Sequence, residues 1–201
     1  MIQKYSQSGF SLVETLVAIT ILLIVIVGPM AISSSTARST SFASDQVTAF
    51  FLAQEGLELA QKARDDFFLP YLVDDTETPW DDFTDTTSSG AYRRCYESNG
   101  CGLEILDTGD VGTPFTCGPA FATNCRLYID TSPSSVRSRF TYDSVGGNKE
   151  ETTFIRTIRF SLGANPYEVK VESEVRWRSG NTRNEQSLTV ETYLLNTYAA
   201  N

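Results

Sequence analysis

The most pronounced pattern along the chain is one long apolar segment near the N-terminus. No charged side chain occurs from Thr15 to Ala37, and Leu16 to Val27 is almost wholly aliphatic. A helix of about 20 apolar residues crosses the roughly 30 Å hydrocarbon core of a bilayer. The pattern therefore predicts a membrane-spanning helix over residues 10–32. The remaining sequence is polar and acidic, so no second span is predicted.

The apolar segment is interrupted by Gly28 and Pro29. Proline removes one helix hydrogen bond and bends the axis, so we expect a kink or a locally melted segment here. Beyond it, residues 33–66 are predicted to form an amphipathic helix that packs its apolar face on a sheet. The residues of this face recur at spacings of three and four: Ala53, Gly56, Leu57, Ala60 and Ala63, with Leu52 and Leu59 at the edge.

The C-terminal third alternates between apolar and polar positions, which is typical of half-buried strands. From Tyr167 to Trp177 the odd positions are largely apolar and the even positions are all charged. The neighbouring strands are predicted from two further sets: Ile158, Phe160 and Leu162 within Phe154 to Leu162, and Leu188, Val190 and Leu194. We therefore expect an antiparallel meander at 151–201, after an irregular, loop-rich region at 67–150. The predicted fold class is α+β, with one long N-terminal helix packed on a C-terminal antiparallel sheet.

The charge balance argues against nucleic acid as a direct partner. The chain has 16 basic and 25 acidic residues and a formal charge of −9, so a phosphate backbone would be repelled. The densest basic stretch, Arg156 to Arg178, alternates with apolar residues and is interpreted as a strand surface. Acidic clusters at 74–77, 81–85 and 107–110 offer oxygen ligands of the kind that calcium takes, but no twelve-residue EF-hand spacing is present, and the clusters are interpreted as solvated turns.

Four cysteines, Cys95, Cys101, Cys117 and Cys125, lie in the loop-rich region. An even number of cysteines beyond a membrane segment predicts disulfides in an oxidising compartment. No metal site is expected, because no pair has C-x-x-C spacing and the chain has no histidine. Three pairings are possible. Pairing of neighbours, which closes two short loops, is favoured.

The extreme N-terminus does not follow the order of an ordinary secretory signal. A short polar leader ends at Gly9, and the apolar segment follows it instead of preceding a small-residue cleavage site. Cleavage after Gly9 would leave the apolar segment on the mature chain, with a cationic α-amine on Phe10. Glu14 lies four residues further on, where a carboxylate beside a membrane span usually marks a partner. It can meet the Phe10 amine of its own or a neighbouring chain.

This arrangement, Gly9-Phe10-Ser-Leu-Val-Glu14-Thr-Leu-Val-Ala-Ile, resembles the class III signal of type IV pilins and type II secretion pseudopilins. The resemblance implies that a prepilin peptidase cuts after Gly9 and N-methylates Phe10, and that Glu14 serves in filament assembly. It also implies a pilin fold. The leader departs from the family in having one basic residue, Lys4, where several are common. Orientation in the membrane therefore rests on the resemblance.

The resemblance also implies the partners and the location. Expected partners are the prepilin peptidase, other pilin or pseudopilin subunits, an inner-membrane assembly platform, an ATPase motor and membrane lipid. The chain would be a single-pass cytoplasmic membrane protein with an extracytoplasmic head, reaching the cell surface or a pilus after assembly. The expected division is a cleaved leader at 1–9, the membrane helix at 10–32, the extramembrane helix at 33–66 and the head at 67–201.

No pattern in the sequence indicates catalysis. Without histidine, Ser-His and Cys-His nucleophile schemes are absent, and no G-x-S-x-G, P-loop or H-E-x-x-H motif occurs. We predict a structural protein without a cofactor, and a minor subunit of a type IV pilus in particular. Two alternatives stay open. One is a pseudopilin of a type II secretion or competence system, and the other is a membrane-anchored adhesive binding module that does not polymerise.

Overall fold

The structure is a computed structural model that describes residues 9, 11–73, 79–106, 108–118, 123–132, 140–146, 148–178 and 184–196. By its internal contacts the chain divides into two compact units, Met1–Ser44 and Asp45–Asn201. Helix α1, Leu12–Phe68, supplies the described secondary structure of the first unit and one layer of the second.

In the first unit, α1 continues through Gly28 and Pro29 without interruption. The expectation of a locally melted segment at these residues is therefore wrong, whereas the expected kink stays a prediction. Two threonine hydroxyls of the apolar segment donate to carbonyls of the preceding turn, Thr15 to Leu12 at 2.9 Å and Thr20 to Leu16 at 2.8 Å. These bonds leave the apolar segment with little unpaired polar surface.

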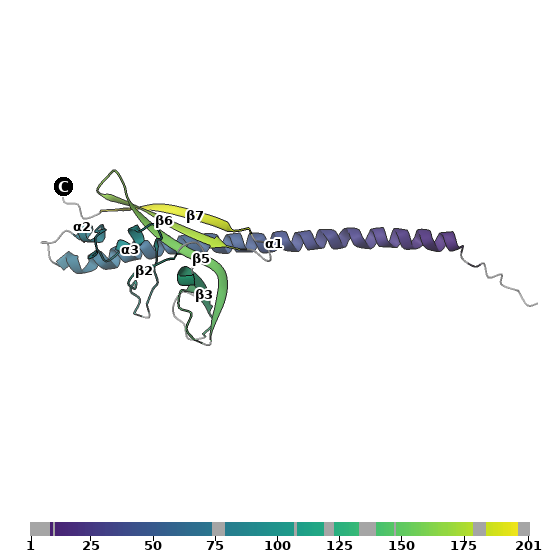
Figure 1. Ribbon diagram of the computed structural model, residues 1–201, viewed down its shortest axis with the longest axis horizontal. Helices are drawn as coiled ribbons and strands as arrows, with labels where there is room; N and C mark the ends of the chain where they lie inside the picture. The colour runs from purple at the N-terminus through teal and green to yellow at the C-terminus, as the bar shows by residue number, and fades with distance from the viewer. Residues whose placement is uncertain are drawn as a thin grey trace, which may run out of the picture. The chain divides into compact units, whose positions relative to one another are not determined.

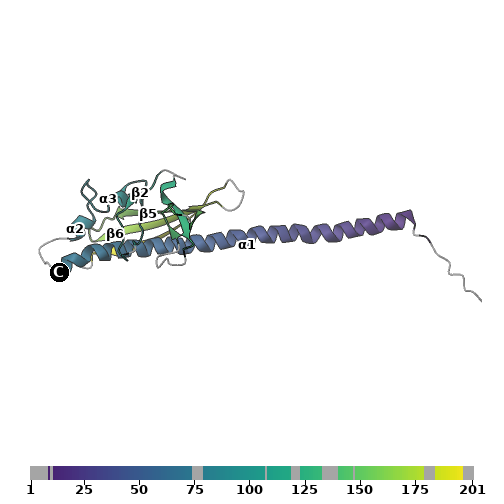
Figure 2. The ribbon, with the colours of Figure 1, turned by 90° about the horizontal axis from the view of Figure 1, so that it is seen from below.

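The second unit is α+β, as predicted. Its helices are the second part of α1, the short α2 (Pro79–Phe83) and α3 (Arg93–Tyr96), and the 3-10 turns η1 (Leu69–Val73) and η2 (Thr123–Cys125). Its strands are β1 (Cys101–Gly102), β2 (Phe115–Thr116), β3 (Arg126–Asp130), β4 (Phe140–Thr141), β5 (Lys149–Leu162), β6 (Glu168–Trp177) and β7 (Gln186–Leu195). Figures 1 and 2 show β5 and β6 running along one side of α1.

The sheet is an antiparallel meander that forks on one side. On one side of β5, β6 and then β7 add in continuous antiparallel register, which confirms the predicted meander. On the other side, β3 pairs with the first half of β5, and β1 pairs with it at Ile158. β4 extends β3, and β2 extends β1. Residues 67–150 are therefore not simply irregular, because their described part contributes four short strands and two α-helices to the head.

Helix α1 packs its small-residue face on the sheet. Its buried residues in the second unit are Ala49, Leu52, Ala53, Gly56, Leu59, Ala60, Ala63 and Phe68, which confirms most of the predicted stripe, although Leu57 is only partly buried. A Cβ at Gly56 would overlap the Ser173 hydroxyl on β6. The glycine therefore allows the sheet to approach the helix closely.

Two expectations for β5 need correction. Leu162 is 56% exposed at the end of the strand, so it is not part of the core. Arg156 is 1% exposed and does not lie on a strand surface. It shares the helix-facing side with Phe154, Ile158 and Phe160, all of which are buried. Its guanidinium donates to the Glu55 carboxylate and to the Leu52 carbonyl of α1.

Candidate functional site

The first candidate site is the start of α1. Glu14 lies in the first turn of the helix, and its backbone N–H donates to the Ser11 carbonyl at 2.9 Å. Glu14 and Gly9 are both exposed, and a Cβ at Gly9 would meet no atom within 4 Å. Phe10 lies outside the described residues. The carboxylate thus sits where the positive end of the helix dipole favours it, with space around it for a partner.

The helix that follows presents apolar side chains on all sides. Every large aliphatic side chain from Leu12 to Ile32 is at least 48% exposed within the chain. By its length and composition, the helix is long and apolar enough to cross a membrane. A helix that is apolar all round needs lipid or other helices around it.

Comparison with known proteins bears on this same segment. Residues 4–28 match the profile of the prokaryotic N-terminal methylation motif, which is typical of type IV pilins and pseudopilins. Over these residues the chain is similar to type IV pilins and pseudopilins. The match spans Gly9 and Glu14 and part of the apolar helix. No curated protein and no solved structure gives a significant match. The motif and the apolar helix fit a membrane-anchored, surface-exposed protein.

The head carries two disulfides. The structure joins Cys95 to Cys101 and Cys117 to Cys125, which is the neighbour pairing that the sequence spacing favours. All four cysteines are at most 1% exposed. The first bond ties α3 to β1, and the second ties the residue after β2 to the turn before β3. The first bond therefore fixes the β1–β2 arm of the fork to α3, and the second links the β1–β2 arm to the β3–β4 arm.

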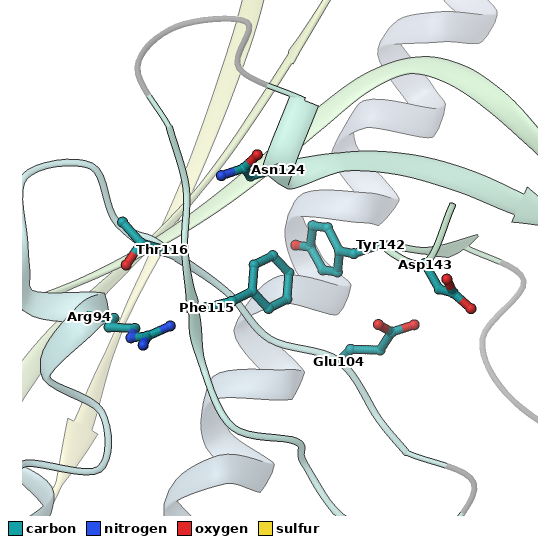
Figure 3. A pocket seen from close by; sticks show the side chains of 7 residues that line it. All are labelled: Arg94, Glu104, Phe115, Thr116, Asn124, Tyr142 and Asp143. Atoms are coloured by element: carbon teal, nitrogen blue, oxygen red, sulfur yellow. The ribbon is translucent and has the colours of Figure 1, made fainter. Parts of the chain in front are cut away.

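A second candidate site lies at the fork of the sheet. A pocket of about 580 Å³ opens between the β1–β2 arm and the β3–β4 arm; it is lined by Arg94, Glu104, Phe115, Thr116, Asn124, Tyr142 and Asp143. Figure 3 shows the Phe115 and Tyr142 rings in the middle, with Glu104 and Asp143 to one side and Arg94 on the other. The ring centroids of Phe115 and Tyr142 lie 5.1 Å apart in an edge-to-face contact. The Thr141 hydroxyl donates to Glu104, so a polar contact also joins the two arms.

The floor of this pocket connects to α1 through buried polar groups. The Nε of Arg156 donates to the Tyr142 hydroxyl at 2.9 Å, and its Nη1 donates to the Glu55 carboxylate at 2.8 Å. Burial raises the pKa of Tyr142, and the Arg156 charge opposes that rise only in part. Burial also acts to lower the pKa of Arg156, but Tyr142 and Glu55 together hold it above its ordinary value. The arginine therefore stays charged inside the head.

Sequence reasoning missed both the pocket and the role of Arg156. The pocket brings together residues from separate short strands, and no local pattern indicates that juxtaposition. For Arg156 a signal was present in the sequence, because it lies two residues before Ile158 and four before Phe160, on the same apolar face of the strand. A single charge at an apolar position of a strand indicates a buried, paired side chain.

The acidic clusters of the sequence form no metal site in the part of the chain that the structure describes. Asp85 accepts bonds from the Thr87 N–H and hydroxyl, and these bonds, the backbone bond first, lower its pKa. The cluster at 74–77 and Asp107 lie outside the described residues. Asp81 and Asp82 lie at the exposed first turn of α2.

Proposed function

We propose that this chain is a structural minor subunit of a type IV pilus, made as a precursor and assembled through its N-terminal helix. The observation that carries the proposal is the methylation motif at 4–28, which includes the start of a helix whose apolar side chains are exposed all round. Such a helix is stable in lipid before assembly and among other subunits' helices afterwards. The large, loop-rich and disulfide-bearing head suits a minor or tip subunit better than an abundant shaft subunit.

Processing and assembly would involve three residues, Gly9, Phe10 and Glu14. The prepilin peptidase removes residues 1–9, and the new N-terminus at Phe10 is N-methylated. The Glu14 carboxylate then pairs with the N-terminal amine of a neighbouring subunit. An inner-membrane assembly platform and its ATPase motor bring the subunits together. The same processing would serve a pseudopilin of a secretion or competence system, which is the second candidate.

Mass spectrometry of the protein from membranes and from sheared surface filaments tests both parts. We expect a chain that begins at N-methylated Phe10 in both fractions, and its presence in filaments favours a pilus over a secretion system. Gly9→Val is the matched variant, because a branched side chain replaces the small residue at the cut and should retain the leader. An intact Met1 terminus in cells with an active prepilin peptidase would refute the proposal.

A further inference from the structure

The pocket at the fork of the sheet has features of a binding site that the assembly function does not use. It lies in the head, far from the methylation motif in sequence. Arg94 of its lining belongs to α3, and the other six residues lie in or just after β1, β2, η2 and β4. One buried disulfide ties the β1–β2 arm to α3 and the other ties the two arms to each other, so the lining is held in one arrangement before any ligand arrives. Preorganised sites lose less conformational entropy on binding.

The charges of the lining select against ionic ligands. Arg94 carries one positive charge, whereas Glu104 and Asp143 carry two negative charges on the other side of the Phe115 ring (Figure 3). An anion attracted by Arg94 would meet the two carboxylates, and a cation attracted by the carboxylates would meet Arg94. A neutral ligand avoids both conflicts.

The same groups offer hydrogen bonds of both kinds. Among the described residues, Arg94 has one hydrogen-bond partner, the Pro114 carbonyl at 3.4 Å, so its other N–H groups are available as donors. Within the described part of the chain, Thr116 and Asn124 have no hydrogen-bond partner for their side chains. Hydroxyl and amide groups both donate and accept, and carboxylates accept. The ligand should therefore carry several groups that can do both.

The aromatic ring of Phe115 supplies an apolar surface among these polar groups. Its ring lies across Gly102 on β1, where an added Cβ would overlap the ring tip. The neighbouring Tyr142 is buried and its hydroxyl is engaged by Arg156, so Phe115 is the ring available to a ligand. A ligand that fits has one face of C–H groups to pack on this ring.

We propose that the pocket binds a neutral saccharide, as one unit of a longer glycan. A pyranose ring combines a C–H face with hydroxyls that donate and accept, and it carries no charge. The pocket is open to solvent, which suits a sugar unit within a chain and predicts affinity in the millimolar range for a disaccharide. A peptide would need a longer strand edge, and the β2 and β4 edges here are two residues each.

The test is saturation-transfer NMR on the full chain in micelles of a detergent without a sugar headgroup. The neutral probes are cellobiose, lactose and diacetylchitobiose. The comparators are glucuronic acid, glucosamine and an uncharged alanine tripeptide. We expect transfer to the ring C–H protons of at least one neutral sugar at millimolar concentration, with none to the comparators. No transfer to any neutral sugar, or transfer to the charged sugars or the peptide instead, would overturn the proposal.

Two variants locate the binding. Phe115→Leu keeps the bulk of the side chain but removes the ring, and Asn124→Ala removes an exposed amide that contributes nothing to the core. Each should reduce the transfer several-fold. Tyr193→Leu is the matched control, because it removes a 52% exposed ring from β7, outside the pocket. Full transfer in both pocket variants, or an equal loss in Tyr193→Leu, would contradict the assignment. Failure of this test leaves the proposed assembly function intact.

Discussion

Arg156 on β5 donates a hydrogen bond of 2.8 Å to Glu55 on α1, and the arginine side chain is only 2% exposed. This ion pair fixes the helix against the sheet at one register. Removing one partner of a buried pair leaves the other charge unpaired, and the cost is typically about 3–5 kcal/mol. The Glu55 side chain retains 27% exposure, so solvent moderates that cost on its side.

We therefore expect Arg156→Ala to lower the free energy of unfolding of the head by about 3 kcal/mol. Arg156→Met should cost less, because it fills the same space without a charge. Urea unfolding followed by fluorescence of Trp80 and Trp177 measures both. The control is Arg93→Ala, since the Arg93–Glu97 pair is exposed at 38% and 44%. Such surface pairs contribute about 0–1 kcal/mol. Equal losses in Arg156→Ala and Arg93→Ala would contradict the interpretation.

Replacing Gly56 with alanine should destabilise the head, whereas the same substitution at an ordinary helix glycine stabilises a protein. Alanine in a helix interior is normally more favourable by about 1 kcal/mol. At Gly56, however, the new Cβ would overlap the Ser173 hydroxyl and lie 3.2 Å from Cδ of Arg156. We expect Gly56→Ala to destabilise the head by about 1–3 kcal/mol in the same urea experiment.

The cause is tested by a double variant. Ser173→Gly opens the space that the Cβ needs and also removes a buried hydroxyl without a partner among the described residues. Gly56→Ala with Ser173→Gly should therefore recover part of the stability that Gly56→Ala alone loses. Gly28→Ala is the control on the same helix, because its Cβ would meet no atom within 4 Å. Strictly additive losses in the double variant would show that the two positions do not clash.

Alkaline pH should destabilise the head through Tyr92. Burial, helped by the Asp66 carboxylate, raises the pKa of Tyr92 from 10.0 to about 12. The folded state thus favours the neutral phenol, so its contribution to stability is full below pH 10 and is lost as pH rises through 12. Tyr92→Phe removes the bond to the Ala63 carbonyl at neutral pH. In that variant, however, the further loss between pH 10 and 12 should be smaller than in the wild type. An equally steep alkaline loss would contradict this account.

The long periodic elements were predictable from sequence, and the short ones were not. In α1 and β6 the spacing of apolar residues repeats over many residues. In β6, for example, Val169, Val171 and Val175 alternate with polar residues, and this alternation predicts which face is buried. Strands β1, β2 and β4 have two residues each and exist only because β5 or its neighbours pair with them. Two residues carry no periodicity, so this fork, and with it the pocket, depends on long-range pairing.

The disulfides give a prediction that does not depend on filament assembly. Non-reducing peptide mapping should find Cys95 linked to Cys101 and Cys117 linked to Cys125 in protein from its native envelope. Each link should contribute about 2–4 kcal/mol to stability. The cysteines are at most 1% exposed, so thiol reagents should reach them only after denaturation and reduction. Free thiols in the native protein, or a crossed pairing, would contradict the structure.

Glu14 has two possible roles that differ greatly in energy. As a residue of the first turn of α1 it complements the helix dipole, which contributes about 0.3–1 kcal/mol. As an assembly residue it neutralises the N-terminal amine of a neighbouring subunit inside an apolar bundle of helices. An unpaired cation in such a setting costs several kcal/mol. The uncharged stretch from Thr15 to Ala37 that follows Glu14 favours the second role, because an unpaired carboxylate beside it would be costly.

We therefore expect Glu14→Ala to leave leader cleavage, membrane insertion and head folding unchanged, while the subunit fails to enter filaments. The measurement is the amount of variant in sheared filaments relative to membranes, with N-terminal mass spectrometry on the membrane fraction. Glu58→Ala is the matched control, because it removes another exposed carboxylate from α1 and should assemble normally. A subunit at the filament tip has neighbours on one side only, so there the loss would be partial. Normal amounts of Glu14→Ala in filaments would show that the carboxylate is not needed for assembly.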